Sequence, residues 1–159
     1  MTLLRRARAA AAAVTDPELP PLTIDDLGIL RDVQLVNDTV EVAITPTYSG
    51  CPAMREIADA IEHAVRESGA EKVRVRLVLS PAWTTDSLTE TARHKLLDLG
   101  IAPPDKGLGP EALFGGRNVV CPRCGSPNTE RISAFGSTAC KALHRCLTCR
   151  EPFEAFKCH

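Results

Sequence analysis

Four of the seven cysteines in this 159-residue chain form two Cys-x-x-Cys pairs near its end. The pairs are Cys121 with Cys124 and Cys146 with Cys149, and 21 residues separate them. Each pair presents two thiolates on one side of a tight turn, and two such turns complete a tetrahedral site for zinc. The same four thiolates also accept iron or an iron–sulfur cluster, which is the less common outcome. We therefore expect a structural Zn²⁺ held by all four cysteines.

A fifth cysteine, Cys51, lies in the loop that joins a predicted strand to a predicted helix. Apolar residues alternate up to Ile44, as in a strand, and recur at helical spacing over 53–68. Ser49 suits the N-cap position of that helix. A thiol at a helix N-terminus lies at the positive end of the helix dipole, which favours the reactive thiolate. Cys51 is thus a candidate working thiol, and the alternative is a small buried core residue.

Two carboxylates and one hydroxyl are candidate partners of Cys51. Asp16 and Glu18 lie in a proline-rich stretch, 16–21, that must be extended. Their side chains are either solvated turn residues or, if the loop folds back, part of a site beside Cys51. Thr47, four residues before Cys51, is the third candidate.

The tail holds two further cysteines, Cys140 and Cys158, with His144 and His159 nearby. They form either a second thiol site or ordinary core thiols of a small domain. The remaining two histidines, His63 and His94, fall on predicted helices at spacings that fit a solvated surface.

The elements that must position these residues define two domains and a linker. Residues 1–101 predict the order helix, hairpin, helix, strand, helix, which is a small α+β two-layer domain with helices on a three-stranded sheet. We expect one face of the strand 73–79 to be buried. We expect Thr85 or Asp86 to cap a helix over 87–99, with Leu99 inward.

The other two predicted segments are a linker and a small metal domain. Residues 102–118 contain several prolines and glycines with little periodicity, which indicates a linker. Residues 119–159 predict an all-β zinc ribbon whose strands flank the cysteine pairs. About 40 residues cannot bury enough surface to fold alone, so metal binding must supply the stability.

Charge and hydropathy exclude some classes of function. The net charge is −1, which disfavours nucleic acid as a partner. No apolar stretch is long enough to cross a membrane. The arginine- and alanine-rich start, 1–13, is either a targeting peptide or, as we prefer, an amphipathic first helix of a cytoplasmic protein.

Several motifs resemble known families. Asp16-Pro17-Glu18, together with 47–52 (TYSGCP) at a strand-to-helix junction, resembles the iron–sulfur cluster assembly domain of SufT-like maturation factors. The match is closer to the D subunits of bacterial phenylacetyl-CoA epoxidase. The segments that carry this second resemblance are 16–20, 27–33, 81–86, 100–104, 135–142 and 156–159.

The second resemblance implies an accessory or maturation factor of a system that degrades phenylacetate aerobically. In that system a di-iron oxygenase forms the epoxide and an iron–sulfur reductase supplies electrons, so those subunits are the implied partners. Cys51 would then hold iron, sulfide or a cluster transiently, supported by Thr47 and by Asp16 or Glu18. The chain itself has no Glu-x-x-His pair for di-iron binding and no glycine-rich dinucleotide fingerprint.

Three other functions remain open at this point. The first is a cysteine enzyme with Cys51 as nucleophile, although no histidine is an evident base partner. The second is a structural or regulatory subunit of the oxygenase with no working thiol. The third is a nucleic-acid-binding ribbon, which the net charge and the lack of a basic and aromatic cluster disfavour.

Overall fold

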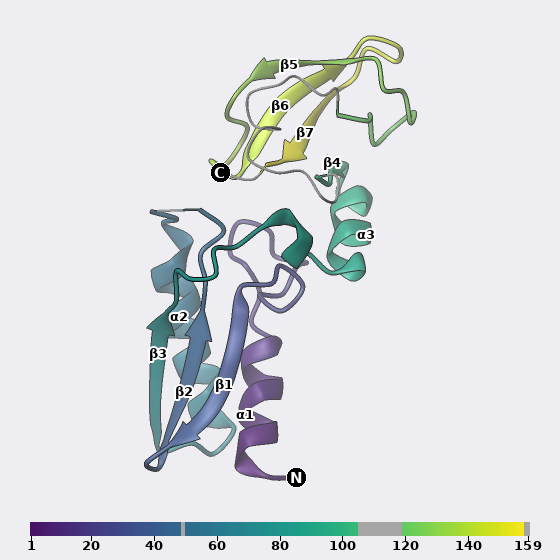
Figure 1. Ribbon diagram of the computed structural model, residues 1–159. Coiled ribbons are helices and arrows are strands. Elements are labelled where there is room, and N and C mark those ends of the chain that lie inside the picture. The colour runs from purple at the N-terminus through teal and green to yellow at the C-terminus, as the bar shows by residue number, and fades with distance from the viewer. Residues whose placement is uncertain (49, 105–118, 158–159) are drawn as a thin grey trace. The chain divides into compact units, whose positions relative to one another are not determined.

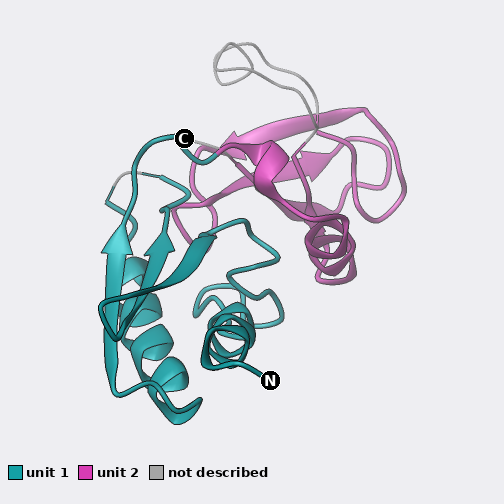
Figure 2. Ribbon diagram, turned by 60° about the horizontal axis from the view of Figure 1, so that its bottom comes forward, with its two compact units in different colours: residues 1–83 teal, residues 84–159 magenta. Residues whose placement is uncertain are grey.

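The computed structural model describes residues 1–48, 50–104 and 119–157. The chain forms two compact units, Met1–Trp83 and Thr84–His159 (Figure 2). The predicted domain limits, 1–101, 102–118 and 119–159, remain a prediction. Most of the predicted linker lies outside the described residues.

The first unit is a two-layer α+β fold, as predicted. Its elements in chain order are α1 (Leu3–Ala12), β1 (Leu30–Val36), β2 (Thr39–Ile44), α2 (Ala53–Glu67) and β3 (Lys72–Leu77). The sheet has the order β1-β2-β3, in which β1 and β2 are antiparallel and β2 and β3 are parallel. Helices α1 and α2 pack against each other and against the sheet (Figure 1).

The hairpin and the core follow from local sequence. Asn37 and Asp38 have φ of 46° and 62°, the left-handed pair that a two-residue hairpin turn requires. Val40, Val42 and Ile44 alternate along β2 and are almost fully buried. This central strand therefore fixes the register of both neighbours and ends directly before the loop that carries Cys51.

The strand β3 differs from the prediction. Val73 and Val75 are only half-buried, and Leu77 is 52% exposed. The prediction that one face of this strand is buried is therefore wrong. The reason is that β3 is an edge strand, which is hydrogen-bonded to β2 on one side only.

The second unit combines a short helical part with a four-stranded sheet. Its strands have the order β4-β7-β6-β5, with β4 parallel to β7 and the other pairs antiparallel. Its elements are the 3₁₀ turn η1 (Thr85–Ser87), α3 (Glu90–Asp98), β4 (Ile101–Ala102), β5 (Thr129–Ser133), β6 (Lys141–Cys146) and β7 (Pro152–Phe156).

Two expectations for the second unit are wrong. Thr89, not Thr85 or Asp86, caps α3, because its hydroxyl accepts a bond from the Ala92 backbone N–H at 3.1 Å. Leu99 is 45% exposed rather than inward, because α3 ends at Asp98 and Gly100, with φ of 72°, reverses the chain. The chain then enters β4, a short strand that the sequence did not predict, at the point where we expected the linker to begin.

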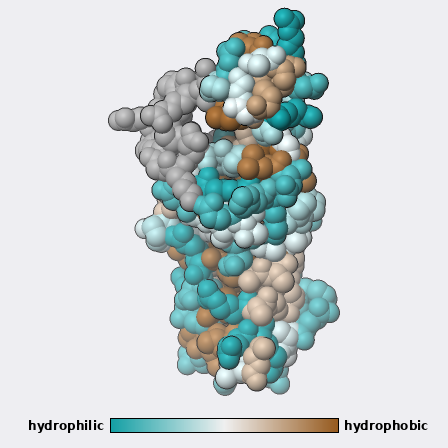
Figure 3. Space-filling model, turned by 90° about the vertical axis from the view of Figure 1, so that its right-hand side faces the viewer, coloured by the Kyte–Doolittle hydropathy of each residue, from teal (hydrophilic) through white to brown (hydrophobic). Residues whose placement is uncertain are grey.

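Large exposed apolar side chains occur in both units, among them Leu79 and Phe135. On the face shown in Figure 3, hydrophobic residues lie in separate patches among polar ones. Such scattered exposure is usual for a protein surface. None of the described helices has the length and apolar character needed to span a bilayer.

Candidate metal centre and thiol loop

The four paired cysteines converge in the second unit. Their sulfur atoms all lie within 4.8 Å of one another. The Sγ atoms of Cys121 and Cys149 are 3.8 Å apart, and those of Cys124 and Cys146 are 3.6 Å apart. A tetrahedral zinc with Zn–S bonds of about 2.3 Å places its sulfurs roughly 3.8 Å apart. The geometry therefore fits one metal ion at the centre of four thiolates.

Two similar backbone turns position the sulfurs. In the first, the Gly125 N–H donates to the Cys121 carbonyl at 2.9 Å, and in the second the Cys149 N–H donates to the sulfur of Cys146 at 3.4 Å. That second bond is the main reason why the pKa of Cys146 is lowered, although burial opposes it. Lowering this pKa favours the thiolate that metal binding requires.

The core of this unit is small and includes metal ligands. Cys121 and Cys146 are almost fully buried beside Phe153, Ala155 and Ala102. This apolar cluster is small, and burying two of the cysteines in it holds their sulfur atoms in place. The four cysteines therefore form a cluster that could hold one metal ion.

Cys51 occupies the junction that its sequence predicts. It lies after β2 and directly before Pro52, the N-cap residue of α2, and its side chain is half-buried. The predicted cap, Ser49, lies outside the described residues, and Pro52 at the N-cap position makes no side-chain hydrogen bond to the helix. Gly50 has φ of 78°, a conformation that favours glycine, so the sharp turn into the helix depends on this residue.

The loop 16–22 is closed and rigid. Asp16 Oδ1 accepts the backbone N–H groups of Glu18 at 2.8 Å and Leu19 at 3.1 Å. The Asp16 N–H donates to the Leu22 carbonyl at 2.9 Å, and the side chains of Leu19 and Leu22 are buried. Asp16 therefore supports the turn that presents Glu18.

This loop folds back beside Cys51, the arrangement that the sequence left open. Burial raises the pKa of the Cys51 thiol, and the negative charges of Glu18 and Asp16 raise it further. Burial likewise raises the pKa of Asp16, with smaller contributions from Glu18 and Glu56. Four acidic groups from two segments thus interact electrostatically, and their mutual repulsion disfavours the Cys51 thiolate.

The expected lowering of the Cys51 pKa is wrong. Two polar groups near the sulfur do lower it, the Ala53 N–H at the start of α2 and the Tyr48 hydroxyl. Loss of solvent around the sulfur outweighs both. The helix N-terminus acts as predicted, but the sequence did not show how much of the thiol is buried.

Two residues near Cys51 were missed. In the sequence, Tyr48 stands out only as part of the motif 47–52, and Glu56 is one of several carboxylates on the predicted helix. Spacing offered a signal for Glu56, because it lies in the first turn of α2. No comparable signal existed for Tyr48. Thr47 is half-buried in the same loop, and its hydroxyl bonds to none of the described residues.

The remaining candidates are placed only in part. Cys140 is buried, and its sulfur lies 3.0 Å from the Thr138 hydroxyl oxygen. Its proposed partner Cys158 lies outside the described residues, so the second thiol site stays a prediction. Across 1–48, 50–104 and 119–157, the four-cysteine cluster is the one group of three or more ligand side chains close enough to share a metal.

Two family models match the chain. The model described as an iron–sulfur cluster assembly protein matches residues 5–77, and the model described as a PaaD zinc beta ribbon domain matches residues 109–157. Each model therefore covers one of the two sites described above.

Relatives support the same division. The chain is 48% identical over 94% of its length to a protein of Escherichia coli (strain K12) assigned as the D subunit of 1,2-phenylacetyl-CoA epoxidase, covering 90% of that protein. It is 34% identical over 55% of its length to an Fe-S protein maturation auxiliary factor of Porphyromonas gingivalis (strain ATCC BAA-308 / W83), covering 82% of it. A solved DUF59 domain from Bacillus anthracis, 26% identical, superposes with a TM-score of 0.54 over 59% of this chain and 91% of its own.

Proposed function

This chain belongs to the family of phenylacetyl-CoA epoxidase D subunits, and we propose that it is an accessory maturation factor of that system. In this role it helps to assemble an iron or iron–sulfur centre for the epoxidase and does not carry out the epoxidation. Its clients are the oxygenase and the iron–sulfur reductase subunits of aerobic phenylacetate degradation. Cys51 is the working thiol.

One observation supports this proposal, namely that the negative charges of Glu18 and Asp16, both in the loop 16–22, act on the Cys51 thiol and raise its pKa further after burial has raised it. A thiol that burial, with a smaller contribution from two carboxylates, keeps protonated suits a site that binds a cation only when one is supplied. Ferrous iron displaces the thiol proton on binding and is attracted by the surrounding negative charge. The cargo is held by few ligands here, which suits release to a client better than permanent storage.

The four cysteines of the second unit have a different role. We propose that they hold a structural Zn²⁺, because four sulfur ligands leave no open position for chemistry. The metal stabilises a ribbon that serves as the docking module. Iron or a cluster in the same four thiolates is the alternative that metal analysis distinguishes.

A structural or regulatory subunit with no working thiol is the second candidate. The raised pKa of Cys51 favours it, because a protonated, half-buried thiol is a poor nucleophile. The same observation disfavours a cysteine enzyme. Among the groups that shift the Cys51 pKa, all of them in the described residues, there is no histidine to act as a base.

The experiment compares client proteins from cells with the wild-type gene, without the gene, and with Cys51→Ser. Iron and acid-labile sulfide are measured in the purified oxygenase and reductase. We expect normal amounts of both polypeptides in all strains, with low metal or sulfide content in the deletion and Cys51→Ser strains. Equal contents in the three strains would leave the structural subunit as the better assignment.

A further inference from the structure

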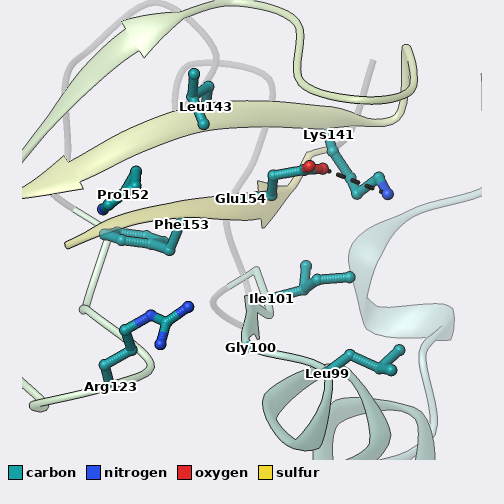
Figure 4. Close-up of a pocket in the computed structure, with 9 residues that line it drawn as sticks. All are labelled: Leu99, Gly100, Ile101, Arg123, Lys141, Leu143, Pro152, Phe153 and Glu154. Atoms are coloured by element: carbon teal, nitrogen blue, oxygen red, sulfur yellow. Dashed lines mark ion pairs between the residues drawn. The ribbon is translucent and has the colours of Figure 1, made fainter.

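The second unit contains a cavity of about 350 Å³ that the metal site does not use. It lies along β7, beside the turn from α3 into β4 (Figure 4). The residues that line it are Leu99, Gly100, Ile101, Arg123, Lys141, Leu143, Pro152, Phe153 and Glu154.

The cavity exists because β4 is short. Ile101 and Ala102 pair with Glu154 and Ala155, so this strand covers only the second half of β7. Within the described residues, no strand lies beside the first half of β7, Pro152 and Phe153, on that edge, and the cavity lies there. A volume of this size admits one or two side chains of another molecule rather than a whole element.

Most of the charged side chains that line the cavity already have partners within the protein. The Lys141 amino group is 3.3 Å from Glu154 Oε2, which also accepts a hydrogen bond from the Ser137 hydroxyl at 2.9 Å. Phe153 is buried and stacks on His144, with ring centroids 5.6 Å apart. Phe153 therefore gives the cavity an apolar wall, and the charges of Lys141 and Glu154 neutralise each other. Neither feature requires a charged ligand.

Arg123 is different. It extends from the first cysteine turn, and Figure 4 shows its guanidinium group pointing into the cavity. It is exposed, and no carboxylate in the described ranges pairs with it. The segment 119–157 carries six Lys and Arg against three Asp and Glu, and four thiolates with one bound Zn²⁺ would add −2, so its net charge would be 6 − 3 − 2 = +1. Half-exposed Leu99 lies on the opposite rim.

We propose that this cavity is the docking site for an acidic segment of a client protein. A carboxylate of that segment pairs with the Arg123 guanidinium, and an adjacent apolar side chain contacts Phe153 and Leu99. The argument is charge complementarity around one unpaired cation beside apolar surface. The inference deepens the proposed function, because it gives the docking role of the ribbon a location and its partner a chemistry.

The test uses the full chain, loaded with zinc, and the purified oxygenase and reductase subunits. Binding is measured by calorimetry for the wild type, Arg123→Glu, Leu99→Ser and the control Arg131→Glu. Arg131 is exposed on β5 outside the cavity, so the control changes the net charge equally. We expect Arg123→Glu to weaken binding of one client roughly tenfold or more, Leu99→Ser to weaken it less, and the control to change it little.

A second measurement identifies the ligand chemistry. Overlapping labelled peptides that tile both clients are titrated against the wild type. We expect the binding peptides to contain Asp or Glu beside an apolar residue and to lose binding when that acid becomes Asn or Gln. The zinc content of Arg123→Glu is measured in parallel, because loss of metal would assign Arg123 to the metal centre and overturn the proposal.

Other outcomes would also overturn it. Equal weakening by Arg123→Glu and Arg131→Glu would indicate long-range attraction rather than a site. Tighter binding of a single-stranded RNA oligonucleotide than of any peptide would assign the cavity to nucleic acid. These results are separate from the proposed function, since client metal content in cells tests maturation whether or not this cavity is the docking site.

Discussion

Gly125 and Arg150 occupy the same position in the two metal-binding turns, directly after the second cysteine of each pair. Their φ angles are 73° and 66°, so both lie in the left-handed region. Glycine adopts this conformation without steric cost, whereas an arginine does so at a cost of about 1 kcal/mol. The residue after each cysteine pair therefore has the same left-handed φ, which is unfavourable at Arg150 and not at Gly125.

This relationship predicts opposite effects for two substitutions. Arg150→Gly should increase the stability of the metal-bound ribbon by about 1 kcal/mol, and Gly125→Ala should decrease it by a similar amount. The measurement is the chelator concentration that removes half of the metal from each variant. If Arg150→Gly releases metal more readily than the wild type, the guanidinium group contributes more than the backbone strain costs.

The metal site predicts a local unfolding. Cys146→Ser should abolish tight metal binding and unfold the ribbon, because structural zinc supplies about 10–16 kcal/mol of apparent binding energy in peptide models. The first unit should stay folded. Its buried Trp83, the single tryptophan of the chain, donates to the Leu27 carbonyl at 2.7 Å and reports on that unit by fluorescence. A ribbon that keeps its amide chemical shifts without metal would contradict this.

The surroundings of Cys51 predict its reactivity with pH. The alkylation rate of Cys51 should reach half its maximum above pH 9.0, the ordinary pKa of the thiol, because burial raises that pKa. Glu18→Gln should lower the midpoint by removing a negative charge, and Tyr48→Phe should raise it by removing a hydrogen-bond donor. Rates are followed on the Cys51 peptide by mass spectrometry. Glu62→Gln, on the exposed side of α2, is the control and should have no effect.

Asp16 predicts a pH dependence of stability. Burial raises its pKa in the folded state above the ordinary 3.8, so the folded chain binds this proton more tightly than the unfolded chain. The contribution of Asp16 to stability is therefore complete below about pH 3.8 and decreases as the pH rises through the folded pKa. Asp16→Asn keeps an oxygen acceptor for the Glu18 N–H and removes this dependence. Urea unfolding followed by Trp83 fluorescence at several pH values should show a flatter profile for the variant.

Much of the first unit was predictable because its signals are local. The alternation of Val40, Val42 and Ile44 and the turn at Asn37-Asp38 each depend on neighbouring residues. The errors concern position in the sheet and competition between elements. The apolar residues of β3 alternate as if buried, but an edge strand does not bury them. The predicted cap of α3 was wrong because four hydroxyl or carboxyl residues, Thr85, Asp86, Ser87 and Thr89, lie within five positions, and each could have capped the helix.

The two candidate sites also differ in how much of each could be predicted from local sequence. The spacing of the four cysteines predicted the cluster that the structure brings together, because two short motifs determine its members. At Cys51 the sequence located the thiol and proposed Asp16 and Glu18, but not the contact with Tyr48 or the degree of burial. Those depend on how the loop 16–22 packs, which no local pattern shows. The short β4 was missed for a similar reason, since two residues beside glycine and proline carry no strand signal.

The central claim is that Cys51 passes iron or sulfide to a client. The most direct test loads the full chain with ferrous iron and sulfide under anaerobic conditions, removes the excess, and adds the metal-free reductase. We predict that the reductase gains iron and acid-labile sulfide, and that Cys51→Ser, matched for zinc content, transfers neither. If Cys51→Ser transfers cluster as fast as the wild type, Cys51 is not the working thiol and the maturation account is wrong.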